Sequence, residues 1–406
     1  MTEAGAQPDT TRPLAGVRVL DLTNVLAGPF CCHQLVHLGA EVLKVEAAGR
    51  GDLARNLGAD AGLNRANMGV SFLAQNAGKR SVTLNLKDPR GVGLLKRLVR
   101  AYDVLVENFR PGVMARLGVD YPALKAENPR LIYAAISGFG QDGPWIARPA
   151  YDQIIQGASG VMQMTGEPDR PPLRVGYPVA DTVAGLTAAM AISAALNARP
   201  RGAMIDVSML ESMIVTMGWA VSNHLMAGVS PSRMGNENNA AAPSGGFRVA
   251  DGMINIAANK DEQWRALVAH LGCEHLLDDP RYATRDDRKR HRHPLRAALE
   301  AVLVTRPGRD WVDELNGIGI PAGPVMSVPE IMAEPQIADR GLLATFPDVP
   351  GVGRDVTVVR TGVKIDGVAP RVEAPPPELG QHNDEVWGEM GLAPEEIADL
   401  KAEGVL

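Results

Sequence analysis

A cluster of potential metal ligands lies near the start of the chain, where His33 and His37 stand one helical turn apart beside Cys31 and Cys32. Histidine nitrogens and cysteine thiolates are common zinc ligands. The two histidines have no carboxylate or further ligand at metal-ligand spacing nearby. Packing within an apolar segment is therefore the favoured interpretation, and the sequence predicts no metal centre.

A single carboxylate, Asp181 in the segment PVADTVAG, stands immediately before a long apolar run. Such an aspartate is an ordinary helix N-cap, and the pattern alone favours that structural role. The backbone N–H groups and positive end of the helix would also favour an ionised carboxylate, the form that a nucleophile needs at neutral pH. Capping and nucleophilic roles can coexist at this position.

Several common catalytic and cofactor motifs are missing. The first strand-to-helix turn reads LDLTNVLAGPF, without G-x-G-x-x-G and with Pro29 where a phosphate-binding glycine would be sought. The chain also lacks a Walker lysine loop, a G-x-S-x-G elbow and a Cys/His set with zinc spacing. These absences argue against a nicotinamide enzyme.

Short apolar runs, each followed by a helical pattern, recur through the first 140 residues. This alternation predicts a parallel sheet with crossover helices. Asp88-Pro89 is expected to be the N-cap and first residue of one such helix. The runs are VRVLDL (17–22), EVLKVE (41–46), SVTLNL (81–86), DVLVEN (103–108) and RLIYAAIS (130–137).

The second half of the chain predicts a smaller domain. The composition at 229–246 is typical of a loop, and Asp251-Gly252 between two strand-like runs predicts a hairpin. A second β-rich piece lies at 356–366. Helices are expected at 181–198, 208–227, 261–271, 294–304 and 309–315. We therefore predict an α/β fold, with a Rossmann-like large domain formed by 1–225 and 331–406 and a small α+β domain at 229–330.

Composition narrows the class of partner. The 406 residues are 45% apolar and 22% charged, with a net charge of -6 and a pI near 5.8. This balance argues against nucleic-acid binding, and the basic stretch Arg285–His293 is interpreted as a solvated face. Three cysteines predict a reducing compartment. The start MTEAGAQPDTTRP lacks the features of a secretory signal, and the longest apolar run, 183–196, is too short to span a bilayer. A cytoplasmic protein without membrane partners is expected.

Segments spread along the chain together resemble the class III CoA-transferases, the family of formyl-CoA transferase and carnitine CoA-transferase. No single piece is diagnostic, but together they follow the family's order over nearly the whole chain. The α-methylacyl-CoA racemases are similar to the same family. The segments are 13–46, GKRSVTLNLKDPRG (78–91), YDVLVENFRPGVMARLG (102–118), NPRLIYAAISGFGQDGP (128–144), PAYDQIIQGASGVMQMTG (149–166), GYPVADTVAGLTAAM (176–190) and LGQHNDEVWGEMG (379–391).

The resemblance implies an activity and an assembly. It places Asp181 at the position of the family's nucleophilic aspartate, which carries CoA between two carboxylic acids through mixed-anhydride and aspartyl-CoA thioester intermediates. The CoA thioester is then a substrate, and no permanently bound cofactor is expected. The resemblance also implies an interlaced homodimer, in which the partner's small domain contributes to the active site.

The resemblance also implies where CoA binds. Lys87, Arg110 and Arg116 suit phosphate groups, although surface charge explains any one of them equally well. Ala47 departs from several relatives, which have arginine there, and Arg50 or Arg55 would have to compensate. The positions that match the family's CoA contacts are Leu26, Ala27, Leu84, Asn85, Leu86, Lys87, Asn108, Phe109, Arg110, Arg116, Pro149, Ala150, Tyr151 and Asp152.

Tyr151 separates transfer from racemisation. The similar racemases have histidine at this position, and tyrosine, with an ordinary pKa near 10, is a poorer acid or base at neutral pH. CoA transfer is favoured over an acyl-CoA isomerase or racemase, and a non-catalytic CoA-binding protein is the third alternative. Asp152 either orients Asp181, binds water or caps a helix. The pair Gly245-Gly246 is either a mobile cover over the site, as in some relatives, or a plain turn. The family suggests succinyl-CoA as a donor.

Overall fold

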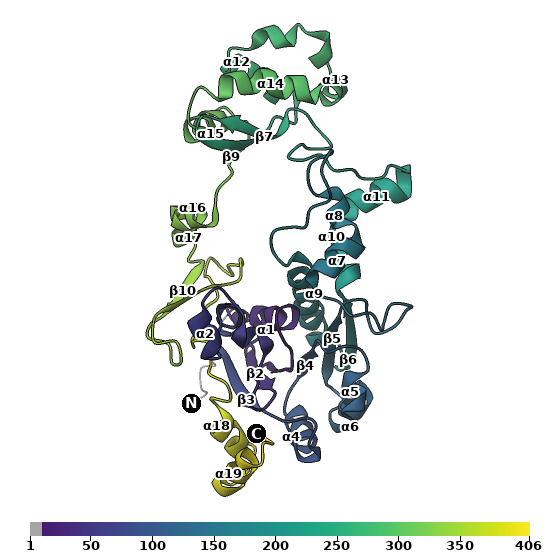
Figure 1. Cartoon of the computed structure of the whole chain (residues 1–406), viewed down its shortest axis with the longest axis vertical. Coiled ribbons are helices and arrows are strands. Elements are labelled where there is room, and N and C mark those ends of the chain that lie inside the picture. The colour runs from purple at the N-terminus through teal and green to yellow at the C-terminus, as the bar shows by residue number, and fades with distance from the viewer. Residues whose placement is uncertain (1–9) are drawn as a thin grey trace, which may run out of the picture. The chain divides into compact units, whose positions relative to one another are not determined.

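The computed structural model describes residues 10–406, and the chain divides into two compact units (Figure 1). The first unit contains the chain up to Val161 together with Val175–Ser222 and Pro335–Leu406. The second contains Met162–Arg174 and Asn223–Glu334. Met162–Arg174 thus groups with the second unit, whereas the sequence placed it in the large domain. The polar N-terminal stretch lies mostly outside the described residues.

A six-stranded sheet forms the centre of the first unit. All its neighbouring strands are parallel, in the order β3-β2-β1-β4-β5-β6, which confirms the predicted parallel sheet. The strand order reverses beside β1, so crossover connections leave a crevice at the carboxyl ends of β1 and β4. The strands are β1 (Arg18–Asp21), β2 (Glu41–Glu46), β3 (Lys79–Thr83), β4 (Val104–Glu107), β5 (Ile132–Ser137) and β6 (Ala203–Ser208).

Helices cover both faces of this sheet and form two separate apolar cores. As predicted, Asp88 caps a helix whose first residue is Pro89. The predicted helix at 208–227 is instead two helices, which are separated at Met217. The helices up to Ala227 are α1 (Ala27–His37), η1 (Leu53–Asn56), α2 (Ala61–Arg65), α3 (Val70–Asn76), α4 (Pro89–Val99), α5 (Val113–Arg116), α6 (Tyr121–Glu127), α7 (Asp152–Ser159), α8 (Val161–Met164), α9 (Val179–Leu196), α10 (Met209–Thr216) and α11 (Gly218–Ala227).

Helix α9 is the one helix of the described chain that is long and apolar enough to cross a membrane. It packs against α1, α10 and the strands β5 and β6, with Ala184, Ala188 and Ile192 fully buried. A Cβ atom at Gly185 would lie 2.6 Å from the carbonyl oxygen of Ala27, so glycine permits the close approach of α9 to α1. These contacts are those of a core helix in a globular domain.

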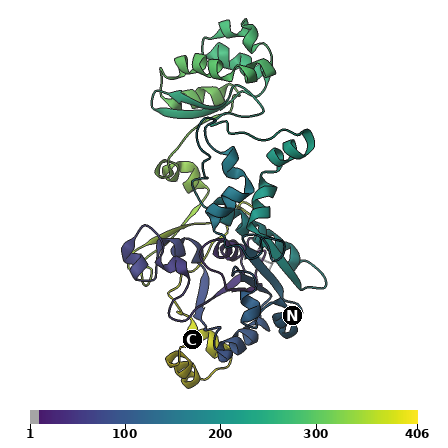
Figure 2. The same cartoon turned by 45° about the vertical axis from the view of Figure 1, so that its right-hand side comes forward.

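The C-terminal segment completes the first unit. The Asn383 side chain accepts a hydrogen bond from the Thr83 N–H (2.9 Å) and donates one to Thr83 Oγ1 (2.7 Å). Trp387 and Leu406 belong to the same apolar core as strand β1's Leu20. The C-terminal helices, drawn in yellow, lie beside the sheet of this unit (Figure 2). The elements are α17 (Pro335–Asp339), β10 (Leu343–Phe346), β11 (Val356–Val359), α18 (Asn383–Glu389) and α19 (Pro394–Ala402), with β10 and β11 antiparallel.

The second unit contains a three-stranded antiparallel sheet in the order β7-β8-β9. The predicted Asp251-Gly252 hairpin connects β7 to β8. The elements are β7 (Ser244–Val249), β8 (Gly252–Ala257), α12 (Asp261–His270), η2 (Glu274–Leu277), η3 (Pro280–Tyr282), α13 (Arg285–Arg290), α14 (Arg292–Leu303), α15 (Gly308–Gly317), β9 (Ala322–Pro324) and α16 (Val328–Ala333).

The basic stretch Arg285–His293 has a structural role in this unit. Arg285 donates to the Ala240 carbonyl (2.8 Å), and Arg292 donates to the Asn238 carbonyl (2.9 Å). Arg288 is buried and donates to the Ala242 carbonyl (3.1 Å). These arginines fasten the loop that precedes β7, so much of the cluster's donor capacity is used within the chain.

Candidate active site

A pocket of ≈ 370 Å³ lies at the carboxyl ends of β1, β4 and β5, where ligands bind in open parallel sheets. Asp181 is the only acid among the described residues that line it, and Arg110 and Arg148 are the only cations. The full lining is Asn24, Val25, Leu26, Ala27, Leu53, Asn108, Phe109, Arg110, Pro111, Ile136, Ser137, Gly138, Phe139, Ile146, Arg148, Ala150, Tyr151, Asp181 and Met209.

The turn after β1 forms one wall of the pocket without a glycine fingerprint. Val25 adopts a left-handed conformation (φ 68°), which is costly for a β-branched residue. Its N–H donates to Asp52 Oδ1 at 2.9 Å. The Asn108 side-chain amide forms two hydrogen bonds of 2.8 Å with the Asn24 backbone: Oδ1 accepts from the N–H, and Nδ2 donates to the carbonyl. Side chains on neighbouring loops therefore hold the turn in its strained shape.

A buried layer of ion pairs lies beneath this turn. Lys79 Nζ contacts Asp21 Oδ2 at 2.8 Å, and Lys44 Nζ contacts Asp52 Oδ2 at 2.9 Å. Burial by itself would raise the pKa of Asp21, but Lys44 and Lys79 outweigh it and hold that pKa well below its usual range. Lys44 also donates to the Thr23 carbonyl at 2.9 Å. These contacts fix the backbone of the turn.

Asp181 is the third residue of α9, and the N-cap is Pro178. The expectation that Asp181 is itself the N-cap is therefore wrong. The carboxylate is half-buried and faces the pocket, and burial, followed by the negative charge of Asp152, raises its pKa to about 7. The helix end was expected to favour ionisation, but desolvation and a like charge outweigh it here. At pH 7 a substantial fraction of Asp181 is ionised.

Asp152 caps α9 from a different part of the chain. Its Oδ1 accepts a hydrogen bond from the Ala180 N–H at 2.8 Å, and its Oδ2 accepts one from Gln156 Nε2 at 2.7 Å. Gln156 is fully buried and also accepts from the Val175 N–H at 2.8 Å. The Asp152–Gln156 pair thus fixes the segment that leads into Asp181.

Half of the residues expected at the CoA site line this pocket. They are Leu26, Ala27, Asn108, Phe109, Arg110, Ala150 and Tyr151, together with the expected nucleophile Asp181. Tyr151 is 69% exposed, so its phenol is open to solvent and ligands. The residues of this set that do not line the pocket are Leu84, Asn85, Leu86, Lys87, Arg116, Pro149 and Asp152.

The residues outside the lining have several different environments. Leu84 is buried in an apolar core, and Asn85 bonds to the C-terminal segment through the Val405 carbonyl (2.7 Å). Lys87 and Arg116 are exposed. Arg55, considered as compensation for Ala47, is fully buried and forms an ion pair with Glu46 (2.7 Å), so its guanidinium is already engaged. Arg50 is exposed in a tight turn.

Sequence reasoning missed the part of the pocket that follows β5. Ser137, Phe139, Ile146 and Arg148 all line it. The Trp145 ring contacts Phe139 edge to face (centroids 5.4 Å apart), and the Arg148 guanidinium lies 4.3 Å from the Trp145 centroid. The signal was available, because β5 was predicted correctly and residues at the carboxyl ends of parallel strands commonly bind ligands.

The N-terminal histidines are core residues. His37 Nδ1 lies 2.8 Å from the His33 carbonyl, and the two rings meet edge to face with centroids 4.3 Å apart. Burial lowers the pKa of both histidines, so both are neutral at pH 7. Cys31 and Cys32 are buried free thiols. Within residues 10–406, no group of three or more potential ligands is placed to hold a metal ion.

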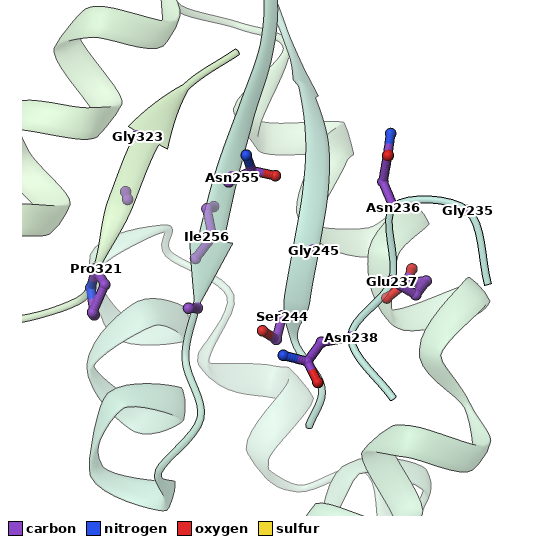
Figure 3. A pocket seen from close by; sticks show the side chains of 12 residues that line it. Gly235, Asn236, Glu237, Asn238, Ser244, Gly245, Asn255, Ile256, Pro321 and Gly323 are labelled. Carbon is purple, nitrogen blue, oxygen red and sulfur yellow. The ribbon is translucent and has the colours of Figure 1, made fainter. Parts of the chain in front are cut away.

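A second pocket, of ≈ 560 Å³, lies within the second unit (Figure 3). Gly245 and Gly246 are in strand β7 at this pocket, paired with Ile256 and Asn255 of β8. The Gly246 N–H donates to the Asn236 carbonyl at 3.0 Å. The glycine pair is therefore part of a sheet, and a Cβ atom at Gly245 would lie 2.4 Å from the Asn236 carbonyl oxygen. Close packing of the backbone explains the glycine at 245.

Comparisons with known proteins assign the family. The model of CoA-transferase family III matches residues 14–383. The chain is 37% identical to succinate–glutarate CoA-transferase of Agrobacterium fabrum, over 94% of this chain and 97% of that protein. It is 41% identical to acetyl-CoA:oxalate CoA-transferase of Acetobacter aceti, over 85% and 89% of the two chains.

A solved structure of a CAIB/BAIF family protein from Brucella suis has a TM-score of 0.82 and 36% identity, covering 94% of this chain and all of that one. The chain belongs to CoA-transferase family III. The predicted resemblance is confirmed, and the family's substrates are CoA thioesters and small carboxylic acids.

Proposed function

We propose that this protein transfers CoA from an acyl-CoA donor to a carboxylic acid acceptor through covalent intermediates on Asp181. The observation that carries the proposal is the position of Asp181, the only acid lining the pocket at the carboxyl edge of the sheet. Its pKa of about 7 leaves a large fraction of the nucleophilic form at neutral pH. Family membership supports the reaction class.

The proposed reaction consists of four exchanges at carbonyl carbon. The Asp181 carboxylate attacks the donor thioester, forming a mixed anhydride and releasing CoA thiolate. The thiolate attacks the aspartyl carbonyl, which gives an aspartyl-CoA thioester and frees the donor acid as its carboxylate. The acceptor carboxylate then attacks this thioester and again displaces CoA thiolate. The thiolate attacks the acceptor's carbonyl, which yields the new acyl-CoA and restores the Asp181 carboxylate.

Each step exchanges one acyl bond for another, so the overall reaction needs no external energy source. Negative charge develops on the carbonyl oxygen in every step, and hydrogen-bond donors there lower the barrier. Ala27, the first residue of α1, lines the pocket, and the first turn of a helix presents backbone N–H groups without partners in the helix. We assign oxyanion stabilisation to this helix end. Coenzyme A acts as a substrate, with no resident cofactor.

For the remaining CoA contacts, we propose the residues expected from the family pattern. Arg110 is exposed at the pocket and suits a phosphate. Lys87 and Arg116 are exposed cations that remain candidates for the more distant phosphates. The phenol of Tyr151 supports transfer over racemisation, since no histidine stands at the pocket to exchange an α-proton.

We further propose a cytoplasmic homodimer, interlaced as the family resemblance implies. Large apolar side chains remain exposed on the first unit, as an association surface requires. Met190 of α9 is 68% exposed, Val215 of α10 75% and Trp219 of α11 92%. Light scattering coupled to gel filtration at micromolar concentration tests this assembly, and a monomer would contradict it.

Intact-protein mass spectrometry tests the mechanism. The chain is incubated separately with succinyl-CoA, acetyl-CoA and other short acyl-CoAs, with and without hydroxylamine, and then mapped by peptide. We expect a CoA thioester or a hydroxamate on Asp181. Asp181→Asn should lose exchange by at least about 10³-fold while remaining folded, whereas Asp399→Asn on the exposed face of α19 should be unaffected. CoA binding without any adduct would favour the isomerase or the non-catalytic alternative.

A further inference from the structure

The pocket holds a cation that the proposed chemistry does not use. Of its two arginines, Arg110 follows β4 and is assigned to CoA phosphate above. Arg148 lies on the loop after β5 and was not among the residues expected at the CoA site. Its position beside the same pocket as Asp181 raises the question of which anion it binds.

The loop that carries Arg148 is anchored at several points. The Gly140 N–H donates to Ser137 Oγ at 3.0 Å, and the Gln141 N–H donates to Asp206 Oδ2 at 2.8 Å. At the base of the loop, a Cβ atom on Gly138 would lie 2.3 Å from the Ala150 Cβ, so the two ends of the loop are in close contact. The loop is thus tied to both β5 and β6.

The guanidinium itself is held by aromatic stacking. It lies 4.3 Å from the Trp145 ring centroid, and Trp145 in turn contacts Phe139, which also lines the pocket. Within residues 10–406, no acid and no hydrogen-bond acceptor engages the Arg148 guanidinium. Stacking occupies a flat face of a guanidinium and leaves its N–H donors available in the ring's plane. Arg148 is therefore a prepositioned cation with free donors.

A dicarboxylic substrate creates a need for such a cation. One carboxyl group reacts at Asp181, while the other keeps its negative charge throughout the exchange. An unpaired carboxylate in a partly desolvated pocket is costly, and a guanidinium binds one with two parallel hydrogen bonds. The relatives named above are CoA-transferases of succinate and glutarate and of oxalate, all dicarboxylates.

We propose that Arg148 binds the non-reacting carboxylate of a dicarboxylic acid substrate and thereby selects diacids over monoacids. The inference rests on the proposed function, because it takes Asp181 as the reacting group. The competing source of an anion is a CoA phosphate. A phosphate is present in every acyl-CoA, whereas the second carboxylate is present only in diacids, so the two are experimentally separable.

The test compares succinyl-CoA with butyryl-CoA, which has the same chain length but lacks the second carboxylate. The rate of adduct formation on Asp181 is measured by mass spectrometry for the unmodified chain and for Arg148→Ala. We expect the rate with succinyl-CoA to fall by about 10- to 100-fold, the loss of one charge-assisted contact. The rate with butyryl-CoA should change by less than about fivefold.

Two further variants serve as controls. Arg148→Lys keeps the charge but not the paired donors, and should recover part of the succinyl-CoA rate. Arg130→Ala removes an exposed arginine before β5, at the opposite edge of the sheet, and should leave both rates unchanged. An equal loss with both donors would assign Arg148 to CoA and overturn the proposal, as would no loss with either.

A binding measurement separates this inference from the proposed mechanism. If the unmodified chain forms no adduct with any acyl-CoA, the mechanism on Asp181 fails by itself. Calorimetric titration with glutarate and with pentanoate then still tests Arg148. The inference requires that Arg148→Ala weaken glutarate binding by about tenfold or more while pentanoate binding stays the same. Equal affinities of the unmodified chain for the two acids would overturn it.

Discussion

Two aspartates near the same edge of the sheet have opposite ionisation behaviour. Asp21 ends β1, is fully buried and contacts Lys79, and its pKa lies well below the usual range. Asp181 begins α9, is only half-buried, has Asp152 as a charged neighbour, and its pKa is raised to about 7. The more buried carboxylate is the stronger acid. The sign of the nearest charge, rather than the degree of burial, therefore separates the carboxylate of the buried ion-pair layer from the carboxylate at the pocket.

Two buried glutamates differ in the same way, because one has a cation partner and the other does not. Glu46 at the end of β2 forms a two-pronged ion pair with Arg55 (2.7 and 2.8 Å). Glu107 at the end of β4 receives only neutral donors, the Phe109 N–H at 2.8 Å and the Tyr133 hydroxyl at 3.1 Å. Burial raises the pKa of Glu107 to about 7. Glu46 is thus neutralised by a cation, and Glu107 is not.

A substitution in the buried layer of ion pairs beneath the first turn should have the largest effect, a loss of folding stability. Lys79→Met leaves Asp21 with Lys44 as its remaining cation, at 3.8 Å. We expect a loss of about 3 to 5 kcal/mol in the free energy of unfolding, because a buried charge is left poorly paired. Urea denaturation measures this loss. Lys125→Met, on the exposed face of α6, should cost less than about 1 kcal/mol, and a similar cost for both variants would contradict the comparison.

Glu107 is the buried carboxylate that lacks a cation partner, and Glu107→Gln should stabilise the chain at high pH. The folded pKa of about 7 exceeds the ordinary glutamate value of 4.5, so between these values the unfolded state ionises first and stability falls as pH rises. The neutral glutamine removes this loss, by about 1 to 2 kcal/mol at pH 8, with no gain at pH 4.5. Thermal unfolding at both pH values measures the difference. A gain that does not depend on pH, or one also seen in the exposed Glu396→Gln, would rule out ionisation as the cause.

The smallest expected effect is that of Asp152 on the pKa of Asp181. Asp152→Asn keeps an oxygen for the Ala180 N–H but removes the charge that adds to the effect of burial on Asp181. The pKa of Asp181 should fall below 7 yet stay above 3.8, which shifts the acidic limb of kcat/KM to lower pH. At pH 6 the activity should rise by less than about tenfold. A pH profile from 5 to 8.5 tests this, and an unmoved limb would show that burial alone sets the pKa.

The parallel sheet was predictable because its strands are buried on both faces and appear as unbroken apolar runs. Strand β6 was missed, since its first four residues alternate between partly exposed and exposed at the sheet edge. Strand β3 was predicted two residues too late, because it begins at Lys79, a charged residue whose buried ammonium group contacts Asp21 and the Pro29 carbonyl. Non-local ion pairs of this kind leave no periodic signal in the sequence.

Site residues that belong to local sequence motifs were predictable, and those positioned by tertiary contacts were not. Leu26, Asn108 and Tyr151 were expected, and all three line the pocket. The N-terminus of α9 was misassigned because its cap is supplied by Asp152, 28 residues earlier. Arg148 was missed because its position depends on stacking against Trp145 within an irregular loop. Pattern rules describe neighbours in sequence, whereas these features depend on neighbours in space.

The C-terminal helices have a consequence for biosynthesis. Residues of α18 and α19 share an apolar core with β1, so the first unit cannot bury that core until residues 383–406 have been made. The second unit draws most of its core from one continuous stretch, 223–334. At roughly 5 to 20 residues per second, translation separates the first unit's early strands from their last partners by tens of seconds. We expect the inserted unit to fold on the ribosome before the first unit does.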